Sequence, residues 1–260
     1  MSALALPAPA GRRALRGAAL PLLLVAAWQW ASTAGVVDGR LLPPLERVAA
    51  AAWTQLVHRD LLGDLGTSLA RNLAGFALGG AAGVGFGLLI GLSRLAHRML
   101  RPSFDALKGI AVFAWIPLIA IWFGFGEASK VAFVALAAFT PVALNTDEGV
   151  RGTPRGLLEV GAALGYGPWQ RLRRIHLPAA LPSILTGLQL GLIYAWLATV
   201  GAEYFLAKGS GIGGVLIEGR DRFDMAQVLL GVLLLGGVGF LLNRLALLAA
   251  DRLAPWRRAA

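Results

Sequence analysis

Residues 153–182, TPRGLLEVGAALGYGPWQRLRRIHLPAALP, form the longest polar, basic stretch between two strongly apolar segments. The segment predicts two short helices joined by a glycine break. Thr153 is expected to cap the first helix, and Pro154 suits its first turn. Gly165 can adopt the left-handed conformation that ends this helix. A second helix is expected between proline boundaries, which are Pro168 at its start and Pro178 and Pro182 at its end.

The composition outside this segment is that of a membrane protein. Apolar residues make up 57% of the 260 residues and charged residues only 15%, which departs from globular usage. The net charge is +10, but the charges cluster between apolar runs, so we expect them to face lipid headgroups and not nucleic acid. The chain has no cysteine, which excludes disulfides, thiolate metal sites and a cysteine nucleophile. We expect no metal site and no catalytic residue.

Six apolar runs predict an all-α membrane protein with six transmembrane helices in a single domain, residues 1–260. The predicted spans are 17–35, 72–92, 109–126, 131–144, 183–202 and 226–250. The first run follows a cluster of arginines, so a cleaved signal peptide is the alternative to a retained helix. Pro43 and Pro44 are expected to open an amphipathic helix before the second span.

The charge distribution predicts the orientation of these spans. Two thirds of the 24 lysines and arginines fall in segments on one side, and most of the 14 acidic residues fall on the other. Basic loops stay in the cytoplasm. We therefore predict a cytoplasmic N-terminus (1–16), a cytoplasmic segment 153–182 and a cytoplasmic tail (251–260).

The second span carries a small residue on one face at every turn. Its glycines recur every four residues, at Gly75, Gly79, Gly83, Gly87 and Gly91. Small residues let membrane helices approach closely. The stripe predicts tight packing against another helix, which the sequence does not identify.

The later spans supply candidates for the lining of a translocation path: Trp115, Pro117, Trp122, Asn145 and Glu203. Pro117 is expected to kink the third span and free a carbonyl near its middle. Trp115 and Trp122 share a face, and core or lipid-facing positions remain the alternative for them. The fourth span is short and contains Pro141, so it needs Asn145 and Thr146 to cross, after an outer turn at Glu127, Ser129 and Lys130. Glu203 ends the fifth span.

The segment 153–182 resembles the "EAA" loop of binding-protein-dependent ABC importer permeases. Glu159, Gly165, Leu177 and Pro178 stand where that pattern has its acidic residue, glycine and Leu-Pro, while Val160 and Gly161 replace its usual alanines. Three further stretches resemble the nitrate/sulfonate/taurine branch: SLARNLAGFALGGAAG (68–83), AWIPLIAIWFGFGEASK (114–130) and LNTDEGVRGTP (144–154). Ala111 and Val112 depart from the prolines common in that branch.

The resemblance implies the partners and the division of labour. It implies a homodimer in the cell inner membrane, two cytoplasmic ATPase subunits and an external solute-binding protein. The chain lacks a GxxxxGK[ST] phosphate loop, so ATP and Mg belong to the partner ATPase and this chain carries no cofactor. Residues implied to couple to the ATPase are Glu159, Gly161, Ala162, Gly165, Arg171, Leu177 and Pro178. The expected substrate is an aliphatic sulfonate, taurine or a nitrate-like anion, with a pyrimidine-like vitamin precursor as the alternative.

Two other classes compete with this interpretation. An ion-coupled secondary transporter normally carries ionisable groups deep in its spans, and the predicted spans are almost free of them. An intramembrane enzyme needs a nucleophile with a base, or paired acids in a cavity, and no such set is recognisable. We also find no central Arg or Lys to bind an anion within a span.

Overall fold

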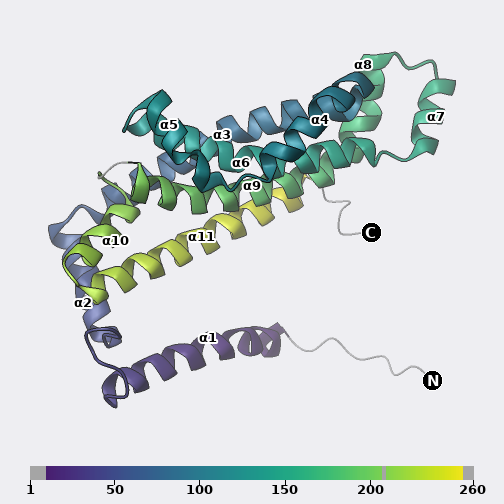
Figure 1. The fold of residues 1–260 in the computed structure, drawn as a ribbon. Helices are drawn as coiled ribbons and strands as arrows, with labels where there is room; N and C mark the ends of the chain where they lie inside the picture. Colours follow the sequence, from purple (N-terminus) through teal and green to yellow (C-terminus); the bar gives the residue numbers. More distant parts are fainter. Residues whose placement is uncertain (1–9, 207–208, 254–260) are drawn as a thin grey trace, which may run out of the picture. The chain divides into compact units, whose positions relative to one another are not determined.

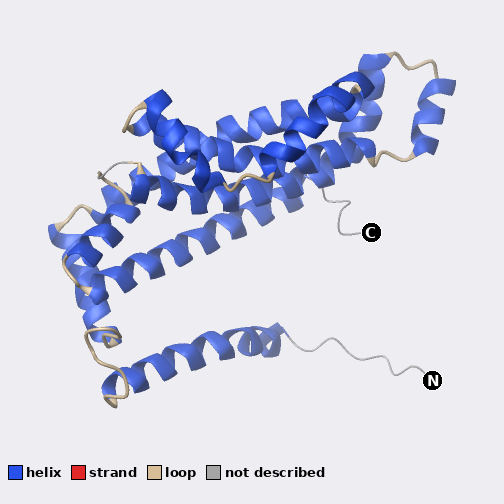
Figure 2. Ribbon diagram, in the orientation of Figure 1, coloured by secondary structure: helices blue, strands red, loops and turns tan. Residues whose placement is uncertain are grey.

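The computed structural model describes residues 10–206 and 209–253, with side chains from residue 19 onward. Every regular element in these ranges is helical (Figure 2). The chain divides into two compact units. One holds the chain up to Asp60 with Val215–Val232, and the other holds Leu61–Gly214 with the chain from Leu233. The predicted cytoplasmic ends, 1–16 and 251–260, fall largely outside the described residues.

The first unit ties α1 (Ala10–Thr33) to the start of α2 (Leu45–His58). The Trp28 indole donates to the Pro43 carbonyl at 2.9 Å, and the Ser32 hydroxyl donates to the Leu42 carbonyl at 2.7 Å. Pro44 caps α2, so the amphipathic helix predicted after Pro43-Pro44 is confirmed. Most of α10 (Ile212–Asp221) and the start of α11 (Met225–Leu253) complete this unit.

The second unit is built on three long helices, α3 (Leu61–Leu92), α6 (Glu127–Arg151) and α9 (Leu177–Phe205). They run side by side in Figure 1, and α6 packs against both α3 and α9 more extensively than those two helices pack against each other. Their core joins Phe133, Val134 and Ala138 of α6 to small residues of α9, which are Ala195, Ala198 and Ala202. Small residues at this contact allow the helix backbones to come close, as expected in a membrane.

The glycine stripe of α3 lies against α6 along its whole length. A Cβ at Gly75 would stand 2.5 Å from Val134, and one at Gly79 would overlap the Ala135 backbone. Gly83, Gly87 and Gly91 meet Val142, Thr146 and Val150 in the same way. The partner that the sequence left open is therefore α6, and a side chain at these positions would push the two helices apart.

Four described helices are long and apolar enough to cross a membrane: Leu61–Leu92, Glu127–Arg151, Pro168–Phe205 and Met225–Arg252. A bent pair, Arg94–Lys108 with Val112–Phe123, makes a fifth if it is counted as one span. The predicted first span coincides with α1, whose described apolar part is Ala19–Thr33. The structure therefore accounts for each of the six predicted apolar runs with a helix or a bent pair.

The third predicted span, 109–126, is shorter in the structure, because its helical part is a 3-10 turn η1 (Val112–Trp115) followed by α5 (Ile116–Phe123). The preceding helix α4 (Arg94–Lys108) meets it at a 96° bend at the start of the predicted span. Pro117 lies in the first turn of α5 and kinks nothing. A proline is tolerated there because the first amides of a helix lack an intrahelical acceptor.

The proline boundaries were also misjudged. α8 (Pro168–Arg171) continues through a π-turn, η2 (Leu172–His176), directly into α9, so neither Pro178 nor Pro182 breaks the helix. The fourth span, expected to be short, is the longer helix α6, which runs through Pro141. Glu127, Ser129 and Lys130, expected in an outer turn, form the first turn of this helix. Gly126 and Ser129 cap that turn through reciprocal contacts of 3.2 and 2.7 Å.

Candidate functional site

Residues 153–182, hereafter the coupling segment, begin with the short helix α7 (Arg155–Ala163). The helix ends as the sequence predicted, with Gly165 at a φ of 69°. The amide of Gly165 donates to the Ala162 carbonyl at 3.0 Å, and that of Tyr166 donates to the Gly161 carbonyl at 2.9 Å. This bonding pattern satisfies the last carbonyls of a helix and sets the direction of the chain that leaves it.

Thr153 does not cap α7, contrary to the prediction. Its hydroxyl donates to the Val150 carbonyl at 2.7 Å and lies 3.2 Å from His176 Nδ1. Pro154 precedes the first helical residue, and no side chain caps it. Thr153 therefore joins the start of the coupling segment to η2, the turn that leads into α9.

Gly161 receives a side chain from the second half of the segment. Ile175, which is buried, reaches the place where a Cβ of residue 161 would stand. Gly161 stands where the EAA pattern usually has alanine, and the packing of Ile175 against it compensates for the missing side chain. The Arg171 side chain adds a second brace, because its Nε donates to the Tyr166 carbonyl at 2.8 Å.

The outward face of α7 is apolar. Leu157, Val160 and Leu164 are 48%, 57% and 62% exposed, and their spacing places them in one stripe. Glu159 lies two residues from Leu157, on the other side of the helix. It is exposed and makes no hydrogen bond or ion pair with the described residues. An apolar stripe with a charged neighbour is the pattern of a helix that docks in a groove.

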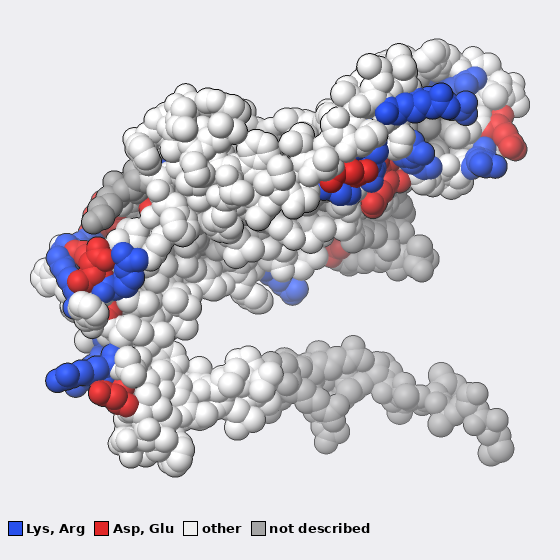
Figure 3. Space-filling view, in the orientation of Figure 1, with Lys and Arg blue, Asp and Glu red and all other residues white. Residues whose placement is uncertain are grey.

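The remaining predicted coupling residues flank this helix. Ala162 and Pro178 are exposed, and Leu177 is half-buried. Arg174 stacks on the Tyr166 ring at 5.3 Å. On the face shown in Figure 3, Lys and Arg side chains gather over α4, α7 and α8, with Asp and Glu side chains among them. This charged end of the second unit contrasts with the largely uncharged surface over the middle of α3 and α6.

A cavity of about 600 Å³ lies between α4, the turn after it, α6 and α9. Trp115 and Asn145 line it, as do the polar side chains of Lys108, Thr140 and Tyr194. Asn145 donates to the Pro141 carbonyl at 2.8 Å. Pro117 and Trp122 are not among the residues that line this cavity, and Trp122 is exposed. Glu203, the last of the predicted lining residues, lies elsewhere.

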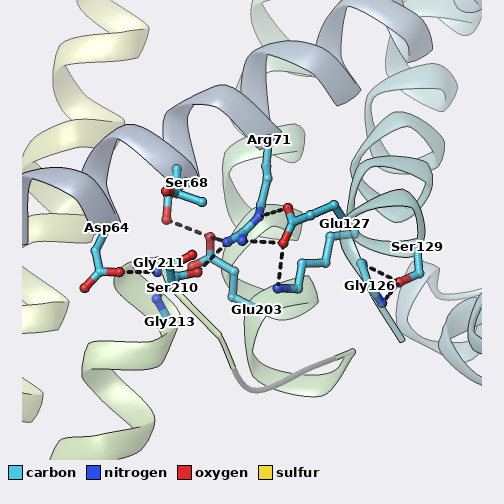
Figure 4. A network of polar contacts seen from close by, with 12 residues as sticks. Asp64, Ser68, Arg71, Gly126, Glu127, Ser129, Glu203, Ser210, Gly211 and Gly213 are labelled. Carbon is cyan, nitrogen blue, oxygen red and sulfur yellow. Dashed lines mark hydrogen bonds and ion pairs between the residues drawn. The ribbon is translucent and has the colours of Figure 1, made fainter. Parts of the chain in front are cut away.

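Glu203 belongs to a polar cluster at the end of α6 opposite the coupling segment, hereafter the Arg71 network (Figure 4). Arg71 donates to Glu203 at 2.8 Å, to Glu127 at 2.6 Å and to the Ser210 carbonyl at 2.6 Å. The network also includes Asp64, Ser68, Lys130 and the amides of residues 211–213. It joins α3, α6, α9 and the loop after α9.

Sequence reasoning missed Arg71 and Lys130 and counted both as outer topology charges. One signal was present for Arg71. It stands four residues before Gly75 and so continues the glycine stripe toward α6. An arginine on a close-packed helix face requires a buried partner.

At the other end of the helices, Arg101 of α4 bonds Asp147 of α6, and Asp147 is buried. The structure uses Asp147 to hold α4 against α6.

Comparison with known sequences places residues 83–259 in a family described as "Binding-protein-dependent transport system inner membrane component". The aliphatic sulfonates transport permease protein SsuC of Bacillus subtilis, named as putative, is 35% identical over 94% of this chain and 88% of its own length. Its Escherichia coli counterpart is 37% identical over 85% and 83%. The bicarbonate transport system permease protein CmpB of Synechococcus elongatus is 31% identical over 90% and 88%.

Solved structures share the fold at lower identity. The MetNI methionine ABC transporter in an inward-facing conformation matches with a TM-score of 0.62 and 20% identity, covering 72% of this chain and 91% of that one. An amino acid ABC transporter with histidines matches with a TM-score of 0.65 and 15% identity, covering 79% and 97%.

Proposed function

The chain belongs to the family of binding-protein-dependent transport system inner membrane components and is a multi-pass permease, and on that premise we propose that it imports a small anion with energy from a separate ATPase. The relatives named for aliphatic sulfonates and for bicarbonate support this substrate class. Both substrates are small anions, and a sulfonate is the first candidate because the sulfonate permeases match at higher identity.

The exposed apolar stripe of α7 carries the coupling part of the proposal. Leu157, Val160 and Leu164 face outward on a helix whose direction is set by Gly165 and Ile175. A short braced helix can transmit a displacement, whereas a flexible loop would absorb it. In the proposed assembly the stripe enters a groove of a cytoplasmic ATPase subunit, and Glu159 meets a basic group at the rim of that groove.

The proposed assembly contains two copies of this chain, two ATPase subunits and an external solute-binding protein, in the cell inner membrane. Both termini and the coupling segment lie in the cytoplasm, as the basic residues favour. ATP-driven closure of the ATPase pair must stabilise one permease conformation over another for transport to be coupled. The cavity at Trp115 and Asn145 is the proposed part of the path within each copy.

Reconstitution in liposomes tests this function. The full transporter, loaded with ATP inside, is expected to take up a radiolabelled aliphatic sulfonate delivered by its binding protein. Glu159→Lys is expected to leave membrane assembly intact and to lower substrate-stimulated ATP hydrolysis. Uptake by the permease without any ATPase, or uptake abolished by a proton uncoupler, would instead establish a secondary transporter.

A further inference from the structure

Two buried cations in the Arg71 network converge on one oxygen of an exposed carboxylate. Arg71 of α3 and Lys130 of α6 have side chains only 4% and 3% exposed. Arg71 Nη2 lies 2.6 Å and Lys130 Nζ 3.3 Å from the same atom, Glu127 Oε1. The Glu127 side chain is 62% exposed. Both positive charges are therefore buried, and the exposed carboxylate of Glu127 bridges them.

The two carboxylates that neutralise Arg71 differ in how firmly they are held. In Figure 4 they approach the guanidinium from opposite sides. Glu203 is 2% exposed and also accepts from the Ser68 hydroxyl at 2.7 Å and from the Gly213 amide at 2.8 Å. Among the residues that the structure describes, Glu127 accepts only from the two cations. One carboxylate is part of the protein interior, and the other is a surface group that can leave.

The backbone before Glu127 allows that departure. Glu127 is the first residue of α6 and follows Gly124, whose φ of 72° is a glycine conformation, and Gly126. Nothing packs within 4 Å of where a Cβ would stand at either glycine. The Glu127 side chain can therefore turn away beside an unpacked stretch of backbone while the Gly126–Ser129 cap stays in place.

The hydrogen-bonding capacity of Lys130 is not met by Glu127. An ammonium group has three donors, and the one hydrogen bond that Lys130 makes within the described residues is to Glu127, at 3.3 Å. A buried charge that is weakly bonded is costly. A tetrahedral oxyanion has enough oxygens to bond the planar fork of Arg71 and the ammonium of Lys130 together. The start of α6 adds a favourable dipole.

We infer that Arg71 and Lys130 form an oxyanion-binding site, that Glu127 occupies it in the unliganded protein, and that a small oxyanion binds by displacing Glu127. The choice of anion class and the placement at the outer face rest on the proposed function. The site lies at the end of α6 opposite the coupling segment, where an anion released by the external binding protein first meets the permease. This site supplies the cationic groups that the predicted spans lack.

Equilibrium binding of ³⁵S-sulfate to the full-length permease in phosphatidylcholine nanodiscs tests the inference. Wild type is expected to bind saturably. Glu127→Gln removes the competing charge, so its dissociation constant should fall about tenfold, which corresponds to about 1.4 kcal/mol. Lys130→Met should weaken binding about tenfold, and Lys130→Arg should retain it. Glu218→Gln, a carboxylate in exposed ion pairs, is the matched control and should bind as wild type does.

Equal sulfate affinity in wild type, Glu127→Gln and Lys130→Arg would overturn the inference, as would the absence of saturable binding in all three. The comparison does not depend on Lys130→Met folding, since the other variants keep the charge or change only a surface group. Sulfonate uptake by the wild-type transporter is measured in parallel. Uptake without Glu127-dependent sulfate binding rejects this site and leaves the proposed function standing. Glu127-dependent sulfate binding without sulfonate uptake supports this site and rejects the proposed function.

Discussion

The Arg71 network and the coupling segment lie at opposite ends of α6 and use charge in opposite ways. In the network, Arg71, Lys130 and Glu203 are buried and Arg71 is bonded to partners on other helices, while Glu127 is exposed. In the coupling segment, Glu159 is exposed and unbonded among the described residues, and the apolar stripe of α7 faces outward. The contrast teaches that the first region holds its own helices together around buried charge, whereas the second is shaped for a protein partner. Substitutions should therefore cost stability in the first region and coupling in the second.

The largest expected effect is that of Arg71→Leu. It leaves Glu203 buried without its cation, and breaking a buried pair costs about 3–5 kcal/mol. Thermal unfolding in detergent should show a markedly lower midpoint. Arg59→Leu is the matched control, because Arg59 pairs with Glu218 in solvent and such pairs contribute about 0–1 kcal/mol. An equal fall in the unfolding midpoint of the two variants would mean that the buried Arg71 network is no more stabilising than an exposed ion pair.

Gly79→Val should be the next most destabilising change. The added side chain would overlap the Ala135 backbone of α6, and overpacking costs about 1–3 kcal/mol or more. Gly85→Val is the control on the same helix, since nothing lies within 4 Å of its added Cβ. The difference in unfolding midpoint measures the close contact of α3 with α6. If both variants unfold together, the stripe is not a packing surface.

Gly165→Ala should have a moderate effect. A residue other than glycine in the left-handed conformation costs about 1–2 kcal/mol, and here the φ is 69°. Gly167→Ala provides the control, because its φ of −69° suits any residue and its surroundings are open. ATP hydrolysis by the full complex should fall for Gly165→Ala alone, since the direction of α7 depends on that turn. Unchanged hydrolysis would show that the turn is not needed for coupling.

Val160→Glu should have the smallest effect on stability and a large one on function. An exposed substitution changes the unfolding free energy by about 0.5 kcal/mol or less, and Val160 is exposed. Substrate-stimulated ATP hydrolysis should nevertheless drop, because a charge enters the apolar stripe. Gly156→Ala, at an open position on the same helix, should leave hydrolysis unchanged. A stimulated rate equal to wild type for Val160→Glu would remove the stripe from the coupling account.

Local patterns in the sequence predicted most of the helices and the coupling turn. The four-residue glycine spacing and the position of Gly165 are properties of neighbouring residues, so they can be read without a structure. The 96° bend between α4 and the helices that follow it is different. Hydropathy finds an apolar run and does not show the angle at which the chain enters it, so 109–126 appeared as one full span although its helices cover only Val112–Phe123.

The sequence did not reveal the Arg71 network because the members of the network are far apart in the chain. Arg71 is 56 residues from Glu127 and 132 from Glu203. Nothing local distinguishes a buried arginine from one that marks membrane topology. Pro178 was misjudged because it lies in the first turn of α9 after the π-turn, where a proline is tolerated. Pro182 lies inside α9, and membrane helices tolerate such prolines.

The central claim is that the apolar stripe of α7 docks on a cytoplasmic ATPase, and cross-linking tests it most directly. The chain has no cysteine, so Val160→Cys creates a unique thiol. In cells that contain the whole transporter, a short thiol-reactive cross-linker is expected to join this residue to the ATPase subunit. Reaction of the same thiol with a membrane-impermeant reagent added outside intact cells, with no cross-link to the ATPase, would contradict the account.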